Sequence, residues 1–385
     1  MATAFVPKES QPGETRVALV ADGVKRLAAT GLSIQVEAGA GLSAGVADAD
    51  YEKVGAKIVA PEVSAGAWSS ADLVLKVQPP TFAEISKLKS GAILVSFVYA
   101  IANRPLADAL VKQNVSALAM ELVPRITRAQ AMDALSSQAT VAGYKAVLLA
   151  AARSPRMFPL LMTAAGTVPP ARVVVFGAGV AGLQAIATAK RLGAVVEATD
   201  VRYAAKEQVE SLGGRFIEVP GLADLEGAGG YAKEASAEVL AKQREAVGKR
   251  VSEADVVITT ALVPGRPAPK LVSADQVRSM KRGAVIVDLA VEAGGNCELS
   301  ELGKVVEKHG VTIVGLPNLP ATVPVHASEL YSKNVLNMVK LLVQKDGALA
   351  TDFKDEVLAG SLLAHQGRIV HEATAKALGT QMVTA

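Results

Sequence analysis

A glycine-rich turn carries the clearest chemical signal in the sequence. Residues 173–176 are apolar and predict a buried strand, and Gly177, Gly179 and Gly182 follow it as G-x-G-x-x-G at the start of a predicted helix. The first glycine permits a tight turn, the second lets a pyrophosphate approach the backbone, and the third lets the helix pack on the strand. Free N–H groups at the start of the helix also attract phosphates. We therefore expect a dinucleotide to contact Gly177, Ala178, Gly179, Val180, Ala181 and Gly182.

Asp200 follows the next predicted strand, Val195–Thr199. A carboxylate at this position accepts hydrogen bonds from the adenosine ribose hydroxyls, and we place Val201 and Arg202 at the same site. Because a carboxylate repels a 2′-phosphate, the sequence favours NAD(H) over NADP(H), an argument that the nearby Arg202 cation slightly weakens. A strand–turn–helix unit that binds no ligand is the alternative explanation for this segment.

Loops after later strands of the same sheet are expected to meet the nicotinamide half of the nucleotide. The reason is that ligands lie across the carboxyl ends of the strands in an open α/β sheet. One such loop contains Ala261 and Leu262, and another contains Asp288, Glu292 and Asn296.

A glycine-rich stretch around Gly230 and Tyr231 is a further candidate for contact with the cofactor. It has little periodicity, so no regular element is expected there. It predicts either a mobile flap that closes on the nucleotide or a surface loop with one packed tyrosine.

A second stretch, residues 121–138, is unusually polar for a chain that is 50% hydrophobic. Four hydrogen-bonding side chains crowd together in it: Arg125, Gln130, Asp133 and Ser136. Helix capping explains part of this pattern, because Thr127 and Gln130 have the spacing of a capping box. Capping gives no reason for Arg125 and Asp133, which leaves a bound ligand as the other interpretation.

Strand and helix patterns alternate over most of the chain, which predicts an α/β fold with parallel sheets. We expect two Rossmann-like domains joined by two long helices around a cleft. Residues 1–135 and 330–385 are assigned to a discontinuous N-terminal α/β domain. Residues 136–329 are assigned to an NAD(H)-binding domain that includes the linking helices, which the pattern places at 130–153 and 327–343.

Composition narrows the possible functions further. The chain has 385 residues, a net charge of +3 and no basic run, so nucleic acid is not expected as a partner. Its one cysteine allows neither a disulfide framework nor a thiolate metal site, and we predict no metal. The first residues do not resemble a signal peptide, and no apolar run is long enough to span a membrane. Any link to a membrane is expected to come through another chain.

Several motifs resemble the alanine dehydrogenase/transhydrogenase family. They are PKESQPGETRVAL, LKVQPP, MELVPRITRAQAMDALSSQ, the glycine turn, GGYAKE and VDLAVEAGGNC, and together they extend over almost the whole chain. The PRITRAQAMD and GGYAKE stretches are the specific signals, whereas the glycine pattern is widespread. Within the family, the chain is most similar to the soluble NAD(H)-binding component of proton-translocating nicotinamide nucleotide transhydrogenase.

The resemblance implies a function and a set of partners. The soluble component holds NADH and passes a hydride directly to NADP⁺ held by an NADP(H)-binding component, while a membrane-spanning component couples transfer to proton movement. It implies a homodimer located in the cytoplasm and attached peripherally to the inner membrane through its partners. In this family the residues that correspond to Arg125, Gln130, Asp133 and Ser136 meet the nicotinamide nucleotide.

Alanine dehydrogenase shares the architecture and is the competing enzymatic interpretation. Lys76 and Arg16 occupy the places of that enzyme's lysine and of its substrate-carboxylate ligand. However, the segment 94–103, LVSFVYAIAN, has no histidine where one is expected, and Glu292 stands where a catalytic aspartate would be. Both departures argue against amino-acid oxidation. A non-catalytic NAD sensor is a third interpretation, although the polar stretch is better explained by the positioning of a reactive ring.

Overall fold

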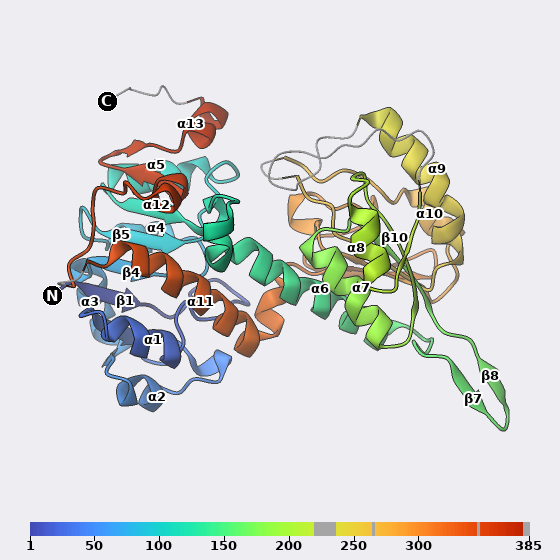
Figure 1. Cartoon of the computed structure of the whole chain (residues 1–385), viewed down its shortest axis with the longest axis horizontal. Helices are drawn as coiled ribbons and strands as arrows, with labels where there is room; N and C mark the ends of the chain where they lie inside the picture. Colours follow the sequence, from blue (N-terminus) through green and yellow to red (C-terminus); the bar gives the residue numbers. More distant parts are fainter. Residues whose placement is uncertain (219–235, 264–265, 345–346, 380–385) are drawn as a thin grey trace. The chain divides into compact units, whose positions relative to one another are not determined.

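The computed structural model describes residues 1–218, 236–263, 266–344 and 347–379. The chain forms two compact units (Figure 1). Unit 1 comprises residues 1–138 and 321–385, and unit 2 comprises residues 139–320. Gly230 and Tyr231 lie outside the described residues.

Unit 1 is built on an eight-stranded sheet with the order β17-β16-β6-β5-β4-β1-β2-β3. The six strands from β3 to β6 are parallel, and β16 and β17 extend the sheet in antiparallel fashion beyond β6. Within the parallel part the order 3-2-1-4-5-6 is that of a Rossmann fold. The strands are β1 (Thr3–Val6), β2 (Ser33–Glu37), β3 (Lys57–Val59), β4 (Leu73–Leu75), β5 (Ile93–Ser96), β6 (Ser116–Ala119), β16 (Leu362–His365) and β17 (Arg368–Ile369).

Helices cover both faces of this sheet because its strands are apolar on both sides. In β1, Ala4 and Val6 belong to the core cluster that includes α1 and α11, whereas Phe5 belongs to the cluster on the opposite face with α3 and α5. Such doubly buried strands are typical of parallel sheets. The helices are α1 (Ala21–Ala28), α2 (Asp48–Lys53), α3 (Ser64–Ser70), α4 (Phe82–Ile85), α5 (Arg104–Lys112), α11 (Pro324–Leu342), α12 (Glu356–Ser361) and α13 (Glu372–Leu378).

Unit 2 is built on a seven-stranded sheet with the order β11-β10-β9-β12-β13-β15-β14. Its six parallel strands, β11 to β15 in this order, repeat the order 3-2-1-4-5-6 seen in unit 1. All neighbours are parallel except β14, which is an antiparallel edge strand. The strands are β9 (Arg172–Phe176), β10 (Val195–Thr199), β11 (Arg215–Phe216), β12 (Val256–Thr259), β13 (Val285–Asp288), β14 (Lys304–Lys308) and β15 (Val311–Gly315).

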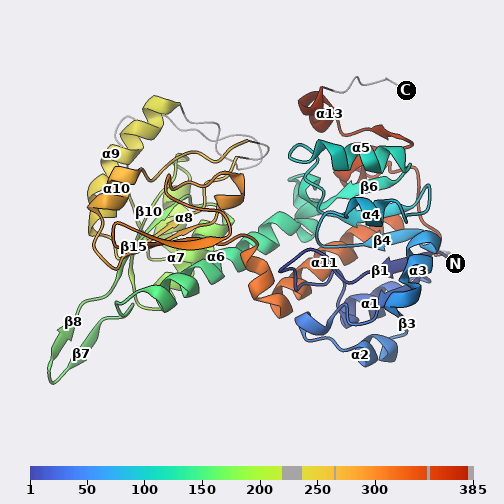
Figure 2. The ribbon, with the colours of Figure 1, turned by 180° about the vertical axis from the view of Figure 1, so that it is seen from behind.

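The core of unit 2 also has two faces. Val173 and Val175 of β9 pack with residues of α6 (Ala134–Arg153) and α7 (Val180–Arg191), and Val174 and Phe176 pack with residues of α9 (Ala237–Glu253) and α10 (Ala274–Ser279). A short helix, α8 (Ala205–Ser211), follows β10. Figure 2 shows α9 and α10 from behind. The expected α/β class with mostly parallel, Rossmann-like sheets is therefore confirmed.

Three details differ from the sequence-based expectation. A hairpin of β7 (Leu161–Thr163) and β8 (Gly166–Val168) was not expected, and it projects from the rest of unit 2 in both views (Figures 1 and 2). The helix expected from residue 130 is broken: a 3₁₀ segment, Thr127–Met132, ends at Asp133 before α6 begins. Finally, α6 carries the chain from unit 1 into unit 2, whereas α11 lies wholly in unit 1.

No helix within the described residues combines the length and the apolar character needed to cross a bilayer.

Candidate nucleotide-binding site

The turn after β9 has a geometry that only glycine permits at two positions. Gly177 has a φ of 91°, in the left-handed region, and a Cβ there would lie 2.6 Å from the Thr260 hydroxyl. A Cβ on Gly182 would lie 1.8 Å from the carbonyl oxygen of Gly177, so the first turn of α7 packs directly on the end of β9. The Thr260 hydroxyl is 3.1 Å from the carbonyl oxygens of both Phe176 and Gly177, which fastens the turn to the end of β12.

Gly179 differs from these two glycines. It precedes α7 as the N-cap residue, with ordinary extended backbone angles, and a Cβ placed on it would meet no atom within 4 Å. The space over Gly179 and the free N–H groups at the start of α7 therefore suit a pyrophosphate. Gly177 and Asp200 directly follow the neighbouring strands β9 and β10, and Val180 at the first helical position is exposed.

Asp200 is buried at the carboxyl end of β10 and organises the turn. Its Oδ2 accepts a 2.7 Å hydrogen bond from the N–H of Ala178, and its Oδ1 accepts one of 2.8 Å from the N–H of Arg202. The Arg202 guanidinium also donates to both oxygens, at 2.9 and 2.8 Å. The carboxylate is thus placed at the edge of the site, next to Val201, and it holds the nearby cation at the same time.

The loop after β12 lies next to the glycine turn, because β9 and β12 are adjacent at the point where the strand order reverses. Ala261 is partly buried, and the Leu262 side chain is exposed. An apolar side chain at the carboxyl edge of such a sheet can contact a ligand ring. The sequence-predicted residues Gly177, Ala178, Gly179, Gly182, Asp200 and Ala261 therefore do gather at one edge of unit 2.

One supporting residue, Gly143, was missed from the sequence. It lies in α6, and a Cβ on it would be 2.1 Å from the carbonyl oxygen of Ala181 in the first turn of α7. The glycine lets α6 approach the start of α7 closely. A glycine in the interior of an otherwise strong helix pattern was the signal that could have revealed it.

In unit 1, capping explains a different pair of residues from the one expected. Asp133 accepts hydrogen bonds from the backbone N–H and the hydroxyl of Ser136, at 2.9 and 2.5 Å, and so caps the start of α6. Ile126, rather than Thr127, is the N-cap residue of the 3₁₀ segment, and no side chain caps that segment. The expected Thr127–Gln130 capping box is therefore absent there, and capping accounts for Asp133 and Ser136 instead.

Arg125 and Gln130 are both exposed. Within the described residues, the Gln130 side chain makes no hydrogen bond, so no capping role accounts for it. Arg128 has a clear structural role, because its guanidinium pairs with both oxygens of Asp355 at 2.8 Å, and Asp355 in turn caps α12.

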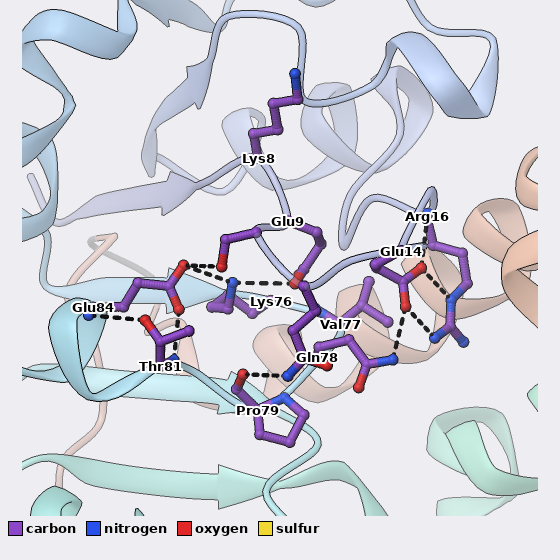
Figure 3. Close-up of polar contacts among 12 residues, drawn as sticks. Lys8, Glu9, Glu14, Arg16, Lys76, Val77, Gln78, Pro79, Thr81 and Glu84 are labelled. Carbon is purple, nitrogen blue, oxygen red and sulfur yellow. Dashed lines mark hydrogen bonds and ion pairs between the residues drawn. The ribbon is translucent and has the colours of Figure 1, made fainter. Parts of the chain in front are cut away.

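The corresponding strand ends in unit 1 are filled by charged side chains (Figure 3). Lys76 directly follows β4, is 1% exposed, and places its Nζ 3.1 Å from Glu9 and 3.3 Å from Glu84. Glu9 also accepts a 2.6 Å hydrogen bond from the N–H of Val77. Burial raises the pKa of Glu9 even though Lys76 acts in the opposite direction. The cation is thus neutralised by carboxylates of the chain itself.

Arg16 is neutralised in the same way. Its Nε and Nη2 donate to the two oxygens of Glu14 at 2.8 and 2.7 Å, and its Nη1 donates to Gln138 at 2.8 Å. Gln78 adds a 2.7 Å hydrogen bond to Glu14 (Figure 3). Burial acts to raise the pKa of Glu14, but hydrogen bonds and charge from Arg16 outweigh it and hold the pKa at about 2.

Within the described residues, no group of three or more histidine, cysteine, aspartate or glutamate side chains is arranged to hold a metal ion.

The chain matches both domains of one protein family. Residues 5–142 match the N-terminal domain described as alanine dehydrogenase/PNT, and residues 146–372 match its C-terminal domain. A relative from Rhodospirillum rubrum, named as the first part of an NAD(P) transhydrogenase alpha subunit, is 54% identical over 376 residues, which cover 96% of this chain and 97% of that protein. An alanine dehydrogenase of Mycobacterium tuberculosis is 33% identical, with 97% and 96% of the two chains covered.

A solved structure gives the same result. The transhydrogenase from Sinorhizobium meliloti superposes with a TM-score of 0.87 at 48% identity, covering 96% of this chain and all of that one. The resemblance seen in the sequence is therefore confirmed, and the chain belongs to the alanine dehydrogenase/PNT family.

Proposed function

We propose that the chain is the NAD(H)-binding subunit of a proton-translocating NAD(P) transhydrogenase. The observation that carries the proposal is the glycine turn of unit 2, which is open over Gly179 and bordered by Asp200 at the point where the strand order reverses. This is where a Rossmann fold binds a dinucleotide. Relatives named as transhydrogenase alpha subunits, at up to 54% identity, support the same conclusion.

The arrangement around Asp200 supports NAD(H) as the nucleotide bound by this chain. Asp200 can accept hydrogen bonds from ribose hydroxyls, and it already holds the Arg202 guanidinium that could otherwise attract a 2′-phosphate. NADP(H) is therefore assigned to a partner subunit. When bound, NADH supplies the hydride, and the protein need supply no proton for that transfer.

In this proposal the contribution of the chain to catalysis is positioning. Two rings must be held face to face at a suitable distance, and small misplacements are costly. We assign this role to Arg125, Gln130, Asp133 and Ser136. The exposed Gln130 amide supports it, because no structural partner accounts for that side chain within the described residues. Asp133 and Ser136 fix where α6 starts and thereby the loop before it.

Other subunits complete the enzyme. The Rhodospirillum rubrum relative is named as only the first part of an alpha subunit, which implies that further parts exist. We assign to them an NADP(H)-binding component and a membrane-spanning component that couples hydride transfer to proton translocation. The present chain is then cytoplasmic and attached to the inner membrane only through these partners.

We also propose that the chain forms a homodimer. The β7–β8 hairpin and the loop before it expose Met157, Leu160, Met162 and Val168, and Met162 is 79% exposed. Apolar side chains gathered on a projecting hairpin favour burial against another chain. We propose that a second copy of the same chain is the partner that buries these side chains.

The charge pairs of unit 1 argue against oxidation of an amino acid. A substrate carboxylate would need an available cation, but Arg16 is held by Glu14 and Lys76 by Glu9 and Glu84. The segment 94–103 also lacks a histidine to move the substrate proton. A reaction such as alanine oxidation therefore has neither its anion site nor its base in this region of the chain.

The test combines binding with transfer. Calorimetry should show that the purified chain binds NADH much more tightly than NADPH. With an NADP-binding component from a related transhydrogenase, it should transfer a hydride from NADH to an NADP⁺ analogue. It should not reduce NAD⁺ with L-alanine at mildly alkaline pH. Equal binding of both nucleotides would contradict the cofactor assignment, and alanine turnover near the enzyme median of about 10 per second would favour the dehydrogenase alternative.

A further inference from the structure

Asp288 is the centre of a buried hydrogen-bond network at the carboxyl end of β13. The residue is 1% exposed, and its carboxylate accepts hydrogen bonds from five donors. They are the hydroxyl groups of Thr259 and Ser300 and the backbone N–H groups of Ala290, Asn296 and Cys297. These bonds join the end of β12 to the loop after β13 and fix the path of residues 288–300.

That path brings Asn296 against the loop after β12. Asn296 is fully buried, and its Oδ1 accepts a 3.0 Å hydrogen bond from the N–H of Ala261. Its Nδ2 donates to the carbonyl oxygens of Ala261 at 2.9 Å and Pro269 at 2.8 Å. The side chain thus holds both backbone polar groups of Ala261, and its three amide hydrogen bonds use both of its donors.

This arrangement bears directly on the nucleotide site. Ala261 follows Thr260, whose hydroxyl fastens the glycine turn through the carbonyl oxygen of Gly177. A displacement of Ala261 would change the loop beside the turn, on the side where the nicotinamide half is expected. Gly179 follows Ala178, whose N–H is held separately by Asp200.

We propose that Asn296, oriented by Asp288, is a positioning residue that holds the Ala261 backbone in the conformation needed to bind the nicotinamide half of NAD(H). The inference rests on the proposed function, because it assumes that NAD(H) binds at the glycine turn. Neither residue touches the reacting atoms in this proposal. Both act through the backbone of the loop after β12.

Two variants of nearly unchanged size test it. In Asn296→Asp a carboxylate oxygen replaces the donor that faces the Ala261 and Pro269 carbonyl oxygens, and in Asp288→Asn a donor replaces one acceptor in the centre of the network. Asp255→Asn is the matched control. Asp255 is equally a buried aspartate of unit 2, 4% exposed, and it binds the N–H of Arg172 and the side chain of Lys281 at the opposite ends of the strands.

Calorimetric titrations with NADH and with ADP, together with melting temperatures, give the readout. ADP has the adenosine and the pyrophosphate but no nicotinamide half. We expect both Asn296→Asp and Asp288→Asn to weaken NADH binding about tenfold or more, with ADP binding changed less than about twofold. Asp255→Asn should lower the melting temperature and leave the affinities for both ligands unchanged.

Two results would overturn the inference. If NADH and ADP affinities fall together in the two variants, the network only maintains the fold. If both variants bind NADH like the native chain, the hydrogen bonds from Asn296 to Ala261 have no role in binding. Failure of the native chain to bind NADH at all would instead remove the proposed function, and the native titration identifies that outcome separately.

Discussion

The two units share a strand order and differ at the point where that order reverses. In unit 2 the two strands that meet at this point are β9 and β12, and each is followed by a small residue: Gly177 directly after β9 and Ala261 shortly after β12. In unit 1 the equivalent strands, β1 and β4, are followed by Glu9 and Lys76, which form a buried ion pair. One edge is open to a phosphate, and the other is filled by the chain's own charges.

The difference shows that topology creates a place for a ligand and local residues decide whether a ligand can occupy it. A pyrophosphate needs free N–H groups and the absence of a Cβ, which unit 2 provides at Gly179. In unit 1 the cations that could bind an anion are present, but Glu9, Glu14 and Glu84 already neutralise them. In the proposed function, unit 1 therefore contributes the polar loop, and unit 2 holds the nucleotide.

If the glycine turn provides the space for a pyrophosphate in unit 2, two glycine substitutions should have different effects. Gly182→Ala should lower the free energy of unfolding by about 3 kcal/mol, because its Cβ would overlap the Gly177 carbonyl oxygen, and NADH binding should be lost. Gly179→Ala should leave stability nearly unchanged and still weaken NADH binding about a hundredfold, because the methyl group occupies the space for the pyrophosphate. Urea unfolding and calorimetry measure the two effects. Native affinity in Gly179→Ala would contradict the proposed path of the pyrophosphate.

If buried ion pairs fill and stabilise the strand ends of unit 1, Glu14→Gln should be strongly destabilising near neutral pH. The pKa of Glu14 in the folded chain is about 2, below its usual value of 4.5. Its ionised form therefore stabilises the fold above about pH 5, by about 3 kcal/mol, and this contribution is lost as the pH falls toward 2. Urea unfolding from pH 7 to pH 2 should show a flatter pH dependence in the variant.

Asp22→Asn is the control for this measurement, since the Asp22–Arg26 pair is largely exposed and should contribute little. Equal pH profiles for Glu14→Gln and the native chain would show that the Arg16 pair does not stabilise unit 1.

If unit 1 contributes through its polar loop, Gln130→Asn should impair transfer without affecting the fold. The shorter amide would be misplaced by ~1 Å, and a misplacement of that size can reduce a rate on the order of a hundredfold. Melting temperature and NADH affinity should remain near native values. Asp133→Ala is the matched comparison, because loss of the cap on α6 should also cost about 1 kcal/mol of stability. A normal transfer rate in folded Gln130→Asn would remove the loop from the catalytic assignment.

The smallest effect expected concerns the choice between nucleotides. Asp200→Ala should reduce the preference for NADH over NADPH about tenfold, because the repulsive carboxylate is lost and Arg202 is released. Titration of both nucleotides with the native chain and the variant measures the change. An unchanged preference would mean that residues other than Asp200 select the cofactor.

The sequence was most informative where the relevant contacts are local. The strand at β9, the glycine turn and the start of α7 are consecutive in the chain, so their pattern predicted both the element order and the tight turn at Gly177. The break at Asp133 was missed because the pattern from Gln130 to Arg153 is helical throughout, and only the Asp133–Ser136 bonds reveal where α6 begins. The antiparallel edge strand β14 carries too many charged residues to read as a strand.

Contacts between residues far apart in the chain could not be predicted from the sequence, for a physical reason. Lys76 and Arg16 were noticed as residues, but Lys76 pairs with Glu9, which lies 67 residues earlier in the chain, and Arg16 also bonds Gln138, which lies 122 residues later. Likewise, the sequence placed Asn296 in the loop after a strand of the sheet, but its hydrogen bonds to the Ala261 backbone depend on the register of β12 against β13. Such contacts follow from the folded sheet and leave no periodic pattern in the sequence.

The network around Asp288 also gives the chain an intrinsic chemical reporter. Cys297, the one cysteine, donates its backbone N–H to Asp288, is fully buried, and has a thiol whose pKa is raised by burial. A thiol reagent can therefore modify this cysteine only when the loop opens, and the labelling rate measures how often that happens. In contrast to global melting, this rate follows the local opening of the loop that holds Ala261, without any engineered label.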